Sequence, residues 1–247
     1  MQNSGFAPIY GMNNFSKILF WARNFFFPAF CSLCETALLY AGEIKHGLCD
    51  NCRHSLEPAG GIKCVKCGKP LISEMEICLP CRNCVHNYDR LFVIYPYTGK
   101  YRKLLTAYKF KKRLSLSHLF VKEIIKKIND NPELADAVIV PVPPRPGKKK
   151  ELGWDQVDYL AGCLEKTKGF LPVNRCLRRR KSKAQKNLNR KDRLENMKDR
   201  IYCAGHIPQT VLVIDDVTTT GSTMEICVKT LKDAGAEHVY GLCLFYD

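Results

Sequence analysis

Residues 211–223, Val-Leu-Val-Ile-Asp-Asp-Val-Thr-Thr-Thr-Gly-Ser-Thr, contain the most specific pattern in the chain. The apolar run at 211–214 predicts a parallel strand that is buried on both faces of a sheet. Asp215 and Asp216 follow at its carboxyl end, where ligands of open α/β sheets bind. Adjacent carboxylates suit sugar hydroxyls or a divalent cation, and the hydroxyl-rich turn at 218–223 precedes a predicted helix whose positive dipole end attracts phosphate. The segment therefore predicts a sugar-phosphate site, with a ribose diol and magnesium at the aspartates.

The same segment resembles the phosphoribosyl pyrophosphate signature of type I phosphoribosyltransferases, in which two acidic residues precede a Thr-Thr-Gly-x-Thr/Ser turn. The resemblance implies that Asp215 and Asp216 hold the ribose and are the candidate catalytic residues, and that the turn holds the 5′-phosphate. The candidate binding residues of this segment are Asp215, Asp216, Val217, Thr218, Thr219, Thr220, Gly221, Ser222 and Thr223. The simpler alternative is a Thr-capped helix that follows a solvated Asp pair.

From Asp89 onward, apolar runs alternate with stretches of helical periodicity. Strands are predicted at 91–95, 137–140, 211–214 and 239–245, and helices at 101–109, 116–128, 157–166 and 224–233. Such alternation is typical of a parallel sheet with helices on both faces. We therefore predict an α/β domain at 87–247 with a type I phosphoribosyltransferase-like sheet, preceded by a small cysteine-rich module.

A second anion site is predicted where residues 137–147 end in a proline-stiffened turn with Arg145 near its tip. In phosphoribosyltransferases the corresponding loop binds pyrophosphate. The resemblance therefore makes Arg145 a candidate contact of phosphoribosyl pyrophosphate, together with Lys181 and Gln185 further along the chain. An ordinary basic surface turn is the alternative.

Nine of the 14 cysteines lie between Cys31 and Cys84, mostly as Cys-x-x-Cys pairs. Two such pairs can complete a tetrahedral zinc site, so the module at 31–86 is predicted to be a double zinc ribbon with two structural ions. Either adjacent pairs share an ion, as in tandem ribbons, or the pairs interleave in a cross-brace. Cys84 extends the last pair toward an iron–sulfur run, but Tyr88 stands where a further cysteine would be needed. The candidate zinc ligands are Cys31, Cys34, Cys49, Cys52, Cys64, Cys67, Cys78 and Cys81.

Residues 1–30 are predicted to form an amphipathic helix, because apolar side chains recur at helical spacing from Phe15 to Phe26. Such a helix packs on its own protein or serves a membrane or a partner. The apolar stretch at 18–30 contains Arg23 and Asn24 and is too short to cross a bilayer, so no transmembrane segment is predicted. Cysteine spacing of the zinc type indicates a reducing compartment, and we expect a cytoplasmic protein.

The formal charge of +15 is concentrated in two segments. Ten of the nineteen residues at 175–193 are Lys or Arg, against the single acid Asp192, and residues 100–113 add seven cations and no acid. This density exceeds what a solvated helix face needs and indicates contact with nucleic acid, single-stranded DNA in particular. The candidate contacts are Lys109, Lys111, Lys112, Arg113, Arg178, Arg179, Arg180, Lys181, Lys183, Lys186 and Arg190.

Two nucleotide-binding classes are excluded by their motifs. Gly42-x-x-x-x-Gly47 is followed by Leu48-Cys49, where a triphosphate-binding loop needs Lys-Ser/Thr. The chain also lacks a Gly-x-Gly-x-x-Gly sequence after a predicted strand, so dinucleotide binding is not expected.

The order of these motifs resembles the ComF family over nearly the whole chain from Cys31. The resemblance is carried by the cysteine pairs, Tyr101-Arg102-x-x-Leu105-x-x-x-Lys109-Phe110, Val140-Pro141-Val142-Pro143, Gly153-Trp154-x-Gln156, Arg179-x-Lys181-x-x-x-Gln185-x-x-Leu188 and the Asp-Asp motif. One departure is Leu152-Gly-Trp-Asp-Gln156, where the family usually has Arg-Gly-Phe-Asn-Gln and so offers an arginine to phosphate.

Members of this family are cytoplasmic proteins linked to DNA uptake in natural transformation. The resemblance implies that the chain binds phosphoribosyl pyrophosphate with magnesium, and that single-stranded DNA and a DNA-uptake helicase are partners. It leaves open whether a phosphoribosyl transfer is catalysed. The alternative is an active phosphoribosyltransferase of nucleobase salvage with no role in DNA uptake.

Overall fold

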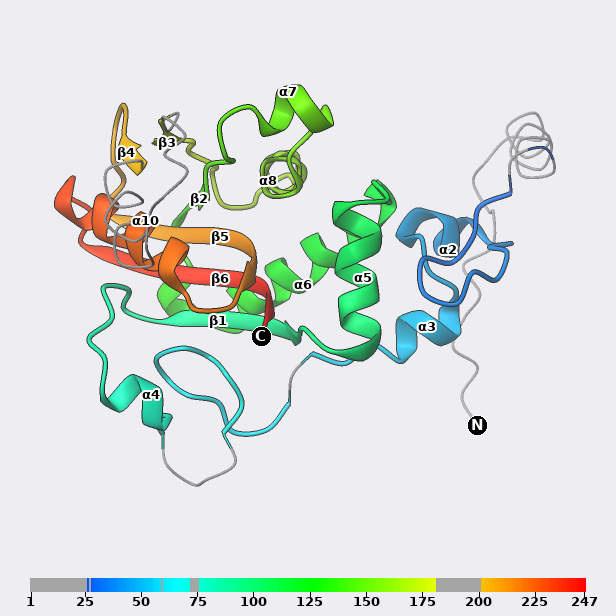
Figure 1. The fold of residues 1–247 in the computed structure, drawn as a ribbon, viewed down its shortest axis with the longest axis horizontal. Helices are drawn as coiled ribbons and strands as arrows, with labels where there is room; N and C mark the ends of the chain where they lie inside the picture. Colours follow the sequence, from blue (N-terminus) through cyan, green and yellow to red (C-terminus); the bar gives the residue numbers. More distant parts are fainter. Residues whose placement is uncertain (1–25, 27, 59, 72–75, 181–200) are drawn as a thin grey trace, which may run out of the picture. The chain divides into compact units, whose positions relative to one another are not determined.

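The computed structural model describes residues 26, 28–58, 60–71, 76–180 and 201–247 (Figure 1). These residues form two compact units, each assembled from two stretches of the chain. The first unit contains the described residues up to 57 together with 99–119, and the second contains those of 58–98 and 120–247. The predicted amphipathic helix lies almost entirely outside the described residues.

The boundary between residues 57 and 58 separates the first four cysteines of the predicted zinc module from the next four. The second set therefore belongs to the same compact unit as the α/β sheet. The domain boundaries predicted at residues 30 and 86 follow motif content instead, and they stay a prediction.

The second unit is built on a four-stranded parallel sheet, which confirms the predicted α/β class. The strands β1 (Leu91–Pro96), β6 (His238–Tyr246), β5 (Thr210–Thr218) and β2 (Val138–Pro141) lie in this order across the sheet (Figure 1). In the register of the sheet, Val211 stands beside Val138 on one side and Val239 on the other. Each of these strands corresponds to a predicted one.

Strand β5 lies at the centre of the core. Its residues 211–214 are at most 1% exposed, as the continuous apolar run predicts for a strand covered on both faces. Helix α10 (Ser222–Asp233) packs Cys227 and Leu231 into the same apolar cluster as Val211 and Val213. Helix α8 (Gln156–Glu165) contacts β2 and β5. Core packing thus holds α10 against β5.

The remaining helices are divided between the units. The first unit contains α2 (Ala41–His46), α3 (Asp50–His54), α5 (Gly99–Lys109) and a 3₁₀ turn (Leu114–Leu116). Helix α6 (Ser117–Asn129) spans the division, and the second unit adds α4 (Leu79–Arg82), a 3₁₀ turn (Pro132–Leu134) and α7 (Lys148–Leu152). Among the described helices, none combines the length and the apolar composition that a membrane span requires.

Two features differ from the predicted elements. An antiparallel hairpin of β3 (Leu177–Arg179) and β4 (Ile201–Cys203) is absent from the prediction, because three residues inside a basic run give too short a pattern to detect. Strand β5 runs to Thr218 rather than ending at 214, since its last residues pair with Phe245 and Tyr246 of β6. Both aspartates therefore lie within the strand, and successive side chains of a strand point to opposite faces.

Candidate functional site

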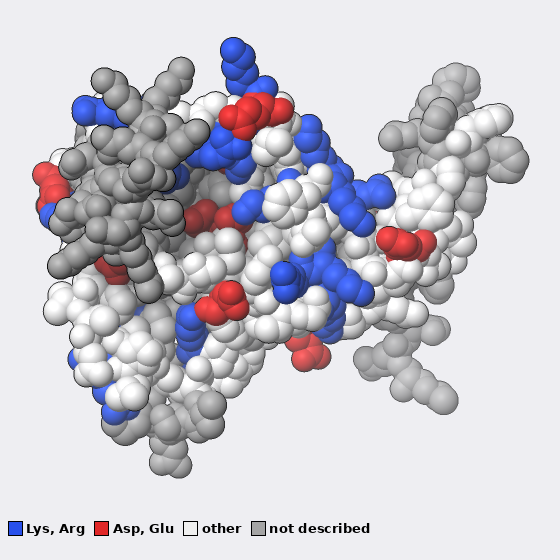
Figure 2. All heavy atoms as spheres, in the orientation of Figure 1, with Lys and Arg blue, Asp and Glu red and all other residues white. Residues whose placement is uncertain are grey.

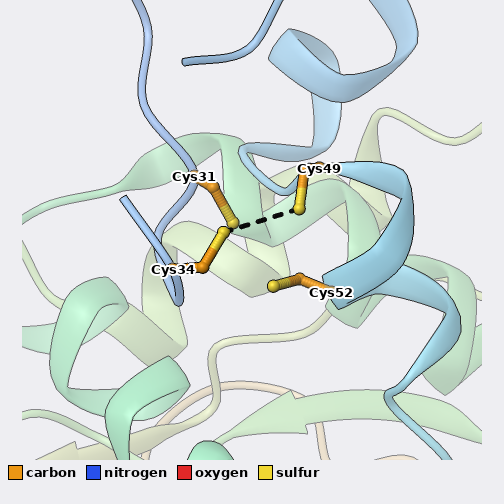
Figure 3. Close-up of side chains that lie close together, drawn as sticks. All are labelled: Cys31, Cys34, Cys49 and Cys52. Carbon is orange, nitrogen blue, oxygen red and sulfur yellow. Dashed lines mark hydrogen bonds between the residues drawn. The ribbon is translucent and has the colours of Figure 1, made fainter. Parts of the chain in front are cut away.

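The first cysteine group is formed by adjacent pairs of the sequence (Figure 3). The Sγ atoms of Cys31, Cys34, Cys49 and Cys52 all lie within 4.8 Å of one another, and those of Cys34 and Cys49 are 3.6 Å apart. A tetrahedral zinc with Zn–S bonds of about 2.3 Å needs sulfur atoms roughly 3.8 Å apart. The hydroxyl of Thr36, which lies 3.2 Å from the sulfur of Cys34, lowers the pKa of that thiol to about 6 and favours the thiolate that binds metal.

The second group has the same arrangement inside the other unit. The Sγ atoms of Cys64, Cys67, Cys78 and Cys81 lie within 4.8 Å of one another, with 3.7 Å between Cys67 and Cys78. Burial acts to raise the pKa of Cys64, but the backbone N–H groups of Cys67, Cys78 and Lys66 donate to the sulfur and bring that pKa down to about 6. The geometry of both groups fits structural zinc. Adjacent pairs share each site, so the tandem arrangement is present and the cross-brace is not, while Cys84 is exposed outside both groups.

The second zinc knuckle rests directly on strand β1. The backbone N–H of Leu91 donates to the carbonyl of Lys66 over 2.8 Å. Gly68 has φ of 68°, and a Cβ at this position would lie 2.5 Å from the carbonyl oxygen of Leu91. Two reasons therefore require glycine at position 68: the backbone is left-handed, and strand β1 approaches too closely for a side chain.

The predicted phosphate turn lines one hollow at the carboxyl end of β5. This hollow encloses about 260 Å³ and is open to solvent. Gly221 has φ of 74° at the residue before α10, a conformation that favours glycine, and the hydroxyls of Thr220 and Ser222 are 2.9 Å apart beside it. Every candidate residue of 215–223 except Asp216 contributes to the wall, which consists of Asp215, Val217, Thr218, Thr219, Thr220, Gly221, Ser222, Thr223, Met224 and Cys243.

The two aspartates of the motif have different surroundings. Asp215 reaches the hollow, and its Oδ1 accepts a hydrogen bond from the backbone N–H of Asp216 over 2.8 Å. Asp216 is 6% exposed and accepts a hydrogen bond of 2.6 Å from the side-chain amide of Gln156. The extension of β5 through both residues explains this difference, because alternation along the strand separates the side chains.

A polar network holds Gln156 against Asp216. The ammonium group of Lys148 donates to Asp155 over 2.6 Å and also donates to the carbonyl oxygen of the Gln156 side chain. Asp155 is buried and caps α8 by accepting from the backbone N–H groups of Val157 and Asp158. The aspartate that departs from the family pattern therefore starts the helix that carries Gln156.

Of the other candidate contacts of phosphoribosyl pyrophosphate, Arg145 is described by the structure and does not line the hollow. Arg145 pairs with Glu151 through both terminal nitrogens, one of them 3.0 Å from the carboxylate, and this contact raises the pKa of the guanidinium group. Lys181 and Gln185 lie outside the described residues. So do three candidate nucleic-acid contacts, Lys183, Lys186 and Arg190.

The described basic candidates fall in two groups, one in each unit. Lys109, Lys111, Lys112 and Arg113 follow one another at the end of α5, a helix over which basic side chains gather in Figure 2. Lys111 and Arg113 line an open hollow of about 620 Å³ together with Phe30, Cys31, Ser32, Glu35 and Ala107.

The second basic group lies on strand β3 and at the residue that follows it. Arg178 and Arg179 line another hollow, of about 660 Å³, beside the proline turn that follows β2. The guanidinium group of Arg180 stacks over the ring of Tyr202 on the neighbouring strand, 4.8 Å from its centre. An arginine that is stacked on an aromatic ring offers both charge and a flat surface to a nucleotide.

Some residues that bear on the site were not among the sequence-based candidates. Gln156 stands in the Gly153-Trp154-x-Gln156 motif, which offered a signal but no assigned role. Lys148 was one of three consecutive lysines with nothing to distinguish it. His86 and Glu225 contact each other across 139 positions of sequence, and no local pattern relates them.

Comparison with known proteins relates both parts of the chain to one family. A model of the double zinc ribbon domain matches residues 22–85. The chain is 27% identical to competence protein F of Haemophilus influenzae, over 87% of this chain and 95% of that protein. It is 29% identical to competence protein ComFC of Streptococcus pneumoniae, over 78% and 84%, and 27% identical to DNA utilization protein YhgH of Salmonella typhimurium, over 88% and 96%. Relatives matched over most of the chain, together with the zinc ribbon match and the two cysteine groups, support the assignment of this chain to the ComF family.

Proposed function

We propose that this chain binds phosphoribosyl pyrophosphate with magnesium at the carboxyl end of β5 and acts in DNA uptake. The observation that carries the ligand assignment is the hollow in which Asp215 and the turn at 217–223 form one wall in front of α10. The names of the relatives, competence protein and DNA utilization protein, support the role in DNA uptake.

The chemistry of the hollow suits a sugar phosphate. The hydroxyls and backbone N–H groups of the turn, at the positive end of the α10 dipole, would hold the 5′-phosphate. Gly221 keeps the middle of the turn free of a side chain, so that the backbone can approach the anion. The carboxylate of Asp215 would accept from ribose hydroxyls, and its hard oxygen atoms match the ligand preference of Mg²⁺. When bound, magnesium would neutralise charge on the diphosphate group.

Asp216 has a supporting role in this proposal. Its carboxylate is held by Gln156, which is itself held by Lys148. This network holds the carboxylate of Asp216, the next residue of β5 after Asp215, outside the wall of the hollow. If phosphoribosyl transfer occurs, the fixed carboxylates would stabilise the positive charge that develops on the ribose.

Calorimetric titration of the zinc-loaded protein with phosphoribosyl pyrophosphate and Mg²⁺ tests the ligand assignment. Asp215→Asn is expected to weaken binding at least tenfold, because it removes the charged acceptor at the wall. Asp233→Asn is the matched control, since Asp233 lies at the far end of α10 in an exposed pair with Lys229. Absence of binding by the wild-type protein, or equal binding by both variants, would refute the assignment.

Single-stranded DNA is the second ligand that we propose, because Arg178 and Arg179 on β3 and the stacked Arg180 directly after it offer charge and an aromatic neighbour together. Binding of a labelled oligonucleotide should weaken steeply as salt is raised, in proportion to the number of phosphates contacted. An Arg178→Ala, Arg180→Ala double variant should show a smaller salt slope. A slope equal to that of the wild type would exclude β3 from the interface.

A further inference from the structure

One histidine connects the second zinc group to helix α10. The ring atom Nε2 of His86 lies 3.2 Å from the sulfur of Cys81, and Nδ1 lies 2.6 Å from a carboxylate oxygen of Glu225. All three residues belong to the second unit, and both side chains of the His86–Glu225 contact are largely shielded, with 19% and 24% of their surface exposed. The contact joins segments that are 139 positions apart.

Glu225 stands at the start of the helix that borders the sugar-phosphate hollow. It lies in the first turn of α10, and its backbone N–H donates to the carbonyl of Gly221 over 2.9 Å. Its second carboxylate oxygen accepts from both the backbone N–H and the side-chain amide of Asn87, over 3.0 and 2.9 Å. His86 and Asn87 therefore hold the two oxygens of the Glu225 carboxylate. The backbone of Glu225 is in turn hydrogen-bonded to Gly221 of the phosphate turn.

His86 is itself held in a defined position. Its ring stacks on that of Tyr88 at 4.6 Å, with an angle of 17° between the planes. Tyr88 is 3% exposed and packs in the apolar cluster that includes Met224 and Cys227 of α10. The histidine is therefore placed by three contacts, with a zinc-group cysteine, an acidic residue of α10 and an aromatic ring of the core.

We propose that His86 is a positioning residue through which the second zinc site fixes the first turn of α10 and hence the phosphate turn at 218–223. Partners in the outer sphere of a metal orient its ligands, and their loss commonly costs 10- to 100-fold in metal affinity or activity. Here the contact would position α10 as well as the metal ligand. Zinc orders Cys81, Cys81 fixes the ring of His86, and His86 fixes the carboxylate of Glu225. This inference rests on the proposed function for its ligand, while the positional effect can be measured without ligand.

The experiment uses the full-length zinc-loaded protein and four variants. His86→Ala removes the link, and Glu225→Ala breaks it from the α10 end without touching the neighbour of the metal. Glu225→Gln keeps the shape of the side chain and one of its two acceptor oxygens, and places an amide donor at the other position. His238→Ala is the control, since His238 is an exposed histidine of the same unit. Each protein is assayed for zinc content, for hydrogen exchange of the amides at 219–226, and for affinity toward phosphoribosyl pyrophosphate with Mg²⁺.

Support would consist of faster exchange at 219–226 and about tenfold weaker binding in His86→Ala and Glu225→Ala. Two zinc ions per chain should be retained in Glu225→Ala, affinity should largely recover in Glu225→Gln, and the control should match the wild type. Unchanged exchange in both alanine variants would overturn the inference, as would unchanged affinity in variants of a protein that binds. If the wild type fails to bind, the proposed function fails, and the exchange measurement alone then decides the positional role.

Discussion

At the scale of single residues, the site depends on contacts that join distant positions. Gln156 and Asp216 are 60 positions apart, yet the amide donates to the carboxylate over 2.6 Å in the protein interior. The sequence predicted both aspartates as neighbours at one ligand. It could not predict that the strand continues through them, because Val217 and Thr218 join β5 only through their pairing with β6.

The contact between Gln156 and Asp216 should contribute measurably to stability. Gln156→Leu removes an amide donor from a buried carboxylate, and we expect a loss of about 2 kcal/mol in the free energy of unfolding. Urea denaturation with zinc present measures the change. Gln209→Leu is the matched control, because Gln209 is exposed and its amide bonds to Glu237 at the surface. Equal midpoints for the two variants would show that the buried contact adds no net stability.

At the scale of elements, the zinc knuckle and the sheet are joined through a glycine. Gly68 directly follows Cys67 in the sequence, and its φ of 68° is the left-handed conformation that glycine adopts most readily. The carbonyl of Leu91 beside it could not be predicted, since it belongs to another element. Strands with a continuous apolar run, such as β5, were predictable, whereas the hairpin of β3 and β4 was not, because its burial alternates over only three residues.

Two glycine variants separate backbone strain from the contact between knuckle and strand. Gly61 has φ of 79° and no atom within 4 Å of an added Cβ, whereas a Cβ at Gly68 would lie 2.5 Å from backbone. Alanine at either position incurs about 1–2 kcal/mol for the left-handed conformation. Gly68→Ala should lower the free energy of unfolding well beyond Gly61→Ala, as measured by urea denaturation. Equal losses would mean that the knuckle does not press on β1.

Helix α6 carries a lysine whose burial makes stability depend on pH. Burial lowers the pKa of Lys127, and the neighbouring Arg90 and Lys126 add to this effect while Asp130 opposes it. As pH rises toward 10.5, the folded state loses this proton before the unfolded state does, so stability rises with pH in that window. Lys127→Met should flatten this rise below about pH 10.5, the ordinary pKa of lysine, in urea titrations. Lys122→Met, at an exposed site of the same helix, should leave the slope unchanged.

At the scale of the whole molecule, the two zinc groups look equivalent in sequence but belong to different units. The first is grouped with α5, and the second with the sheet, where it contacts β1 through residues 66–68 and α10 through His86. Repeated Cys-x-x-Cys spacing predicted two zinc ions and their ligands. The spacing carried no information on which compact unit each zinc group joins, because that depends on contacts with residues far along the chain.

The division predicts that loss of one zinc ion has a different effect in each unit. Cys34→Ser and Cys67→Ser should each reduce the zinc content from two ions to one, as measured by metal analysis of the purified proteins, because a tetrahedral site needs all four thiolates. Affinity for phosphoribosyl pyrophosphate with Mg²⁺ should fall more in Cys67→Ser, since the second group contacts β1 and α10 within its own unit. Calorimetry compares the two variants at equal protein concentration, with hydrogen exchange of β1 as an independent readout. A larger loss of affinity in Cys34→Ser would show that the ligand depends on the first unit, and that the sheet with its second zinc group does not form a sufficient site.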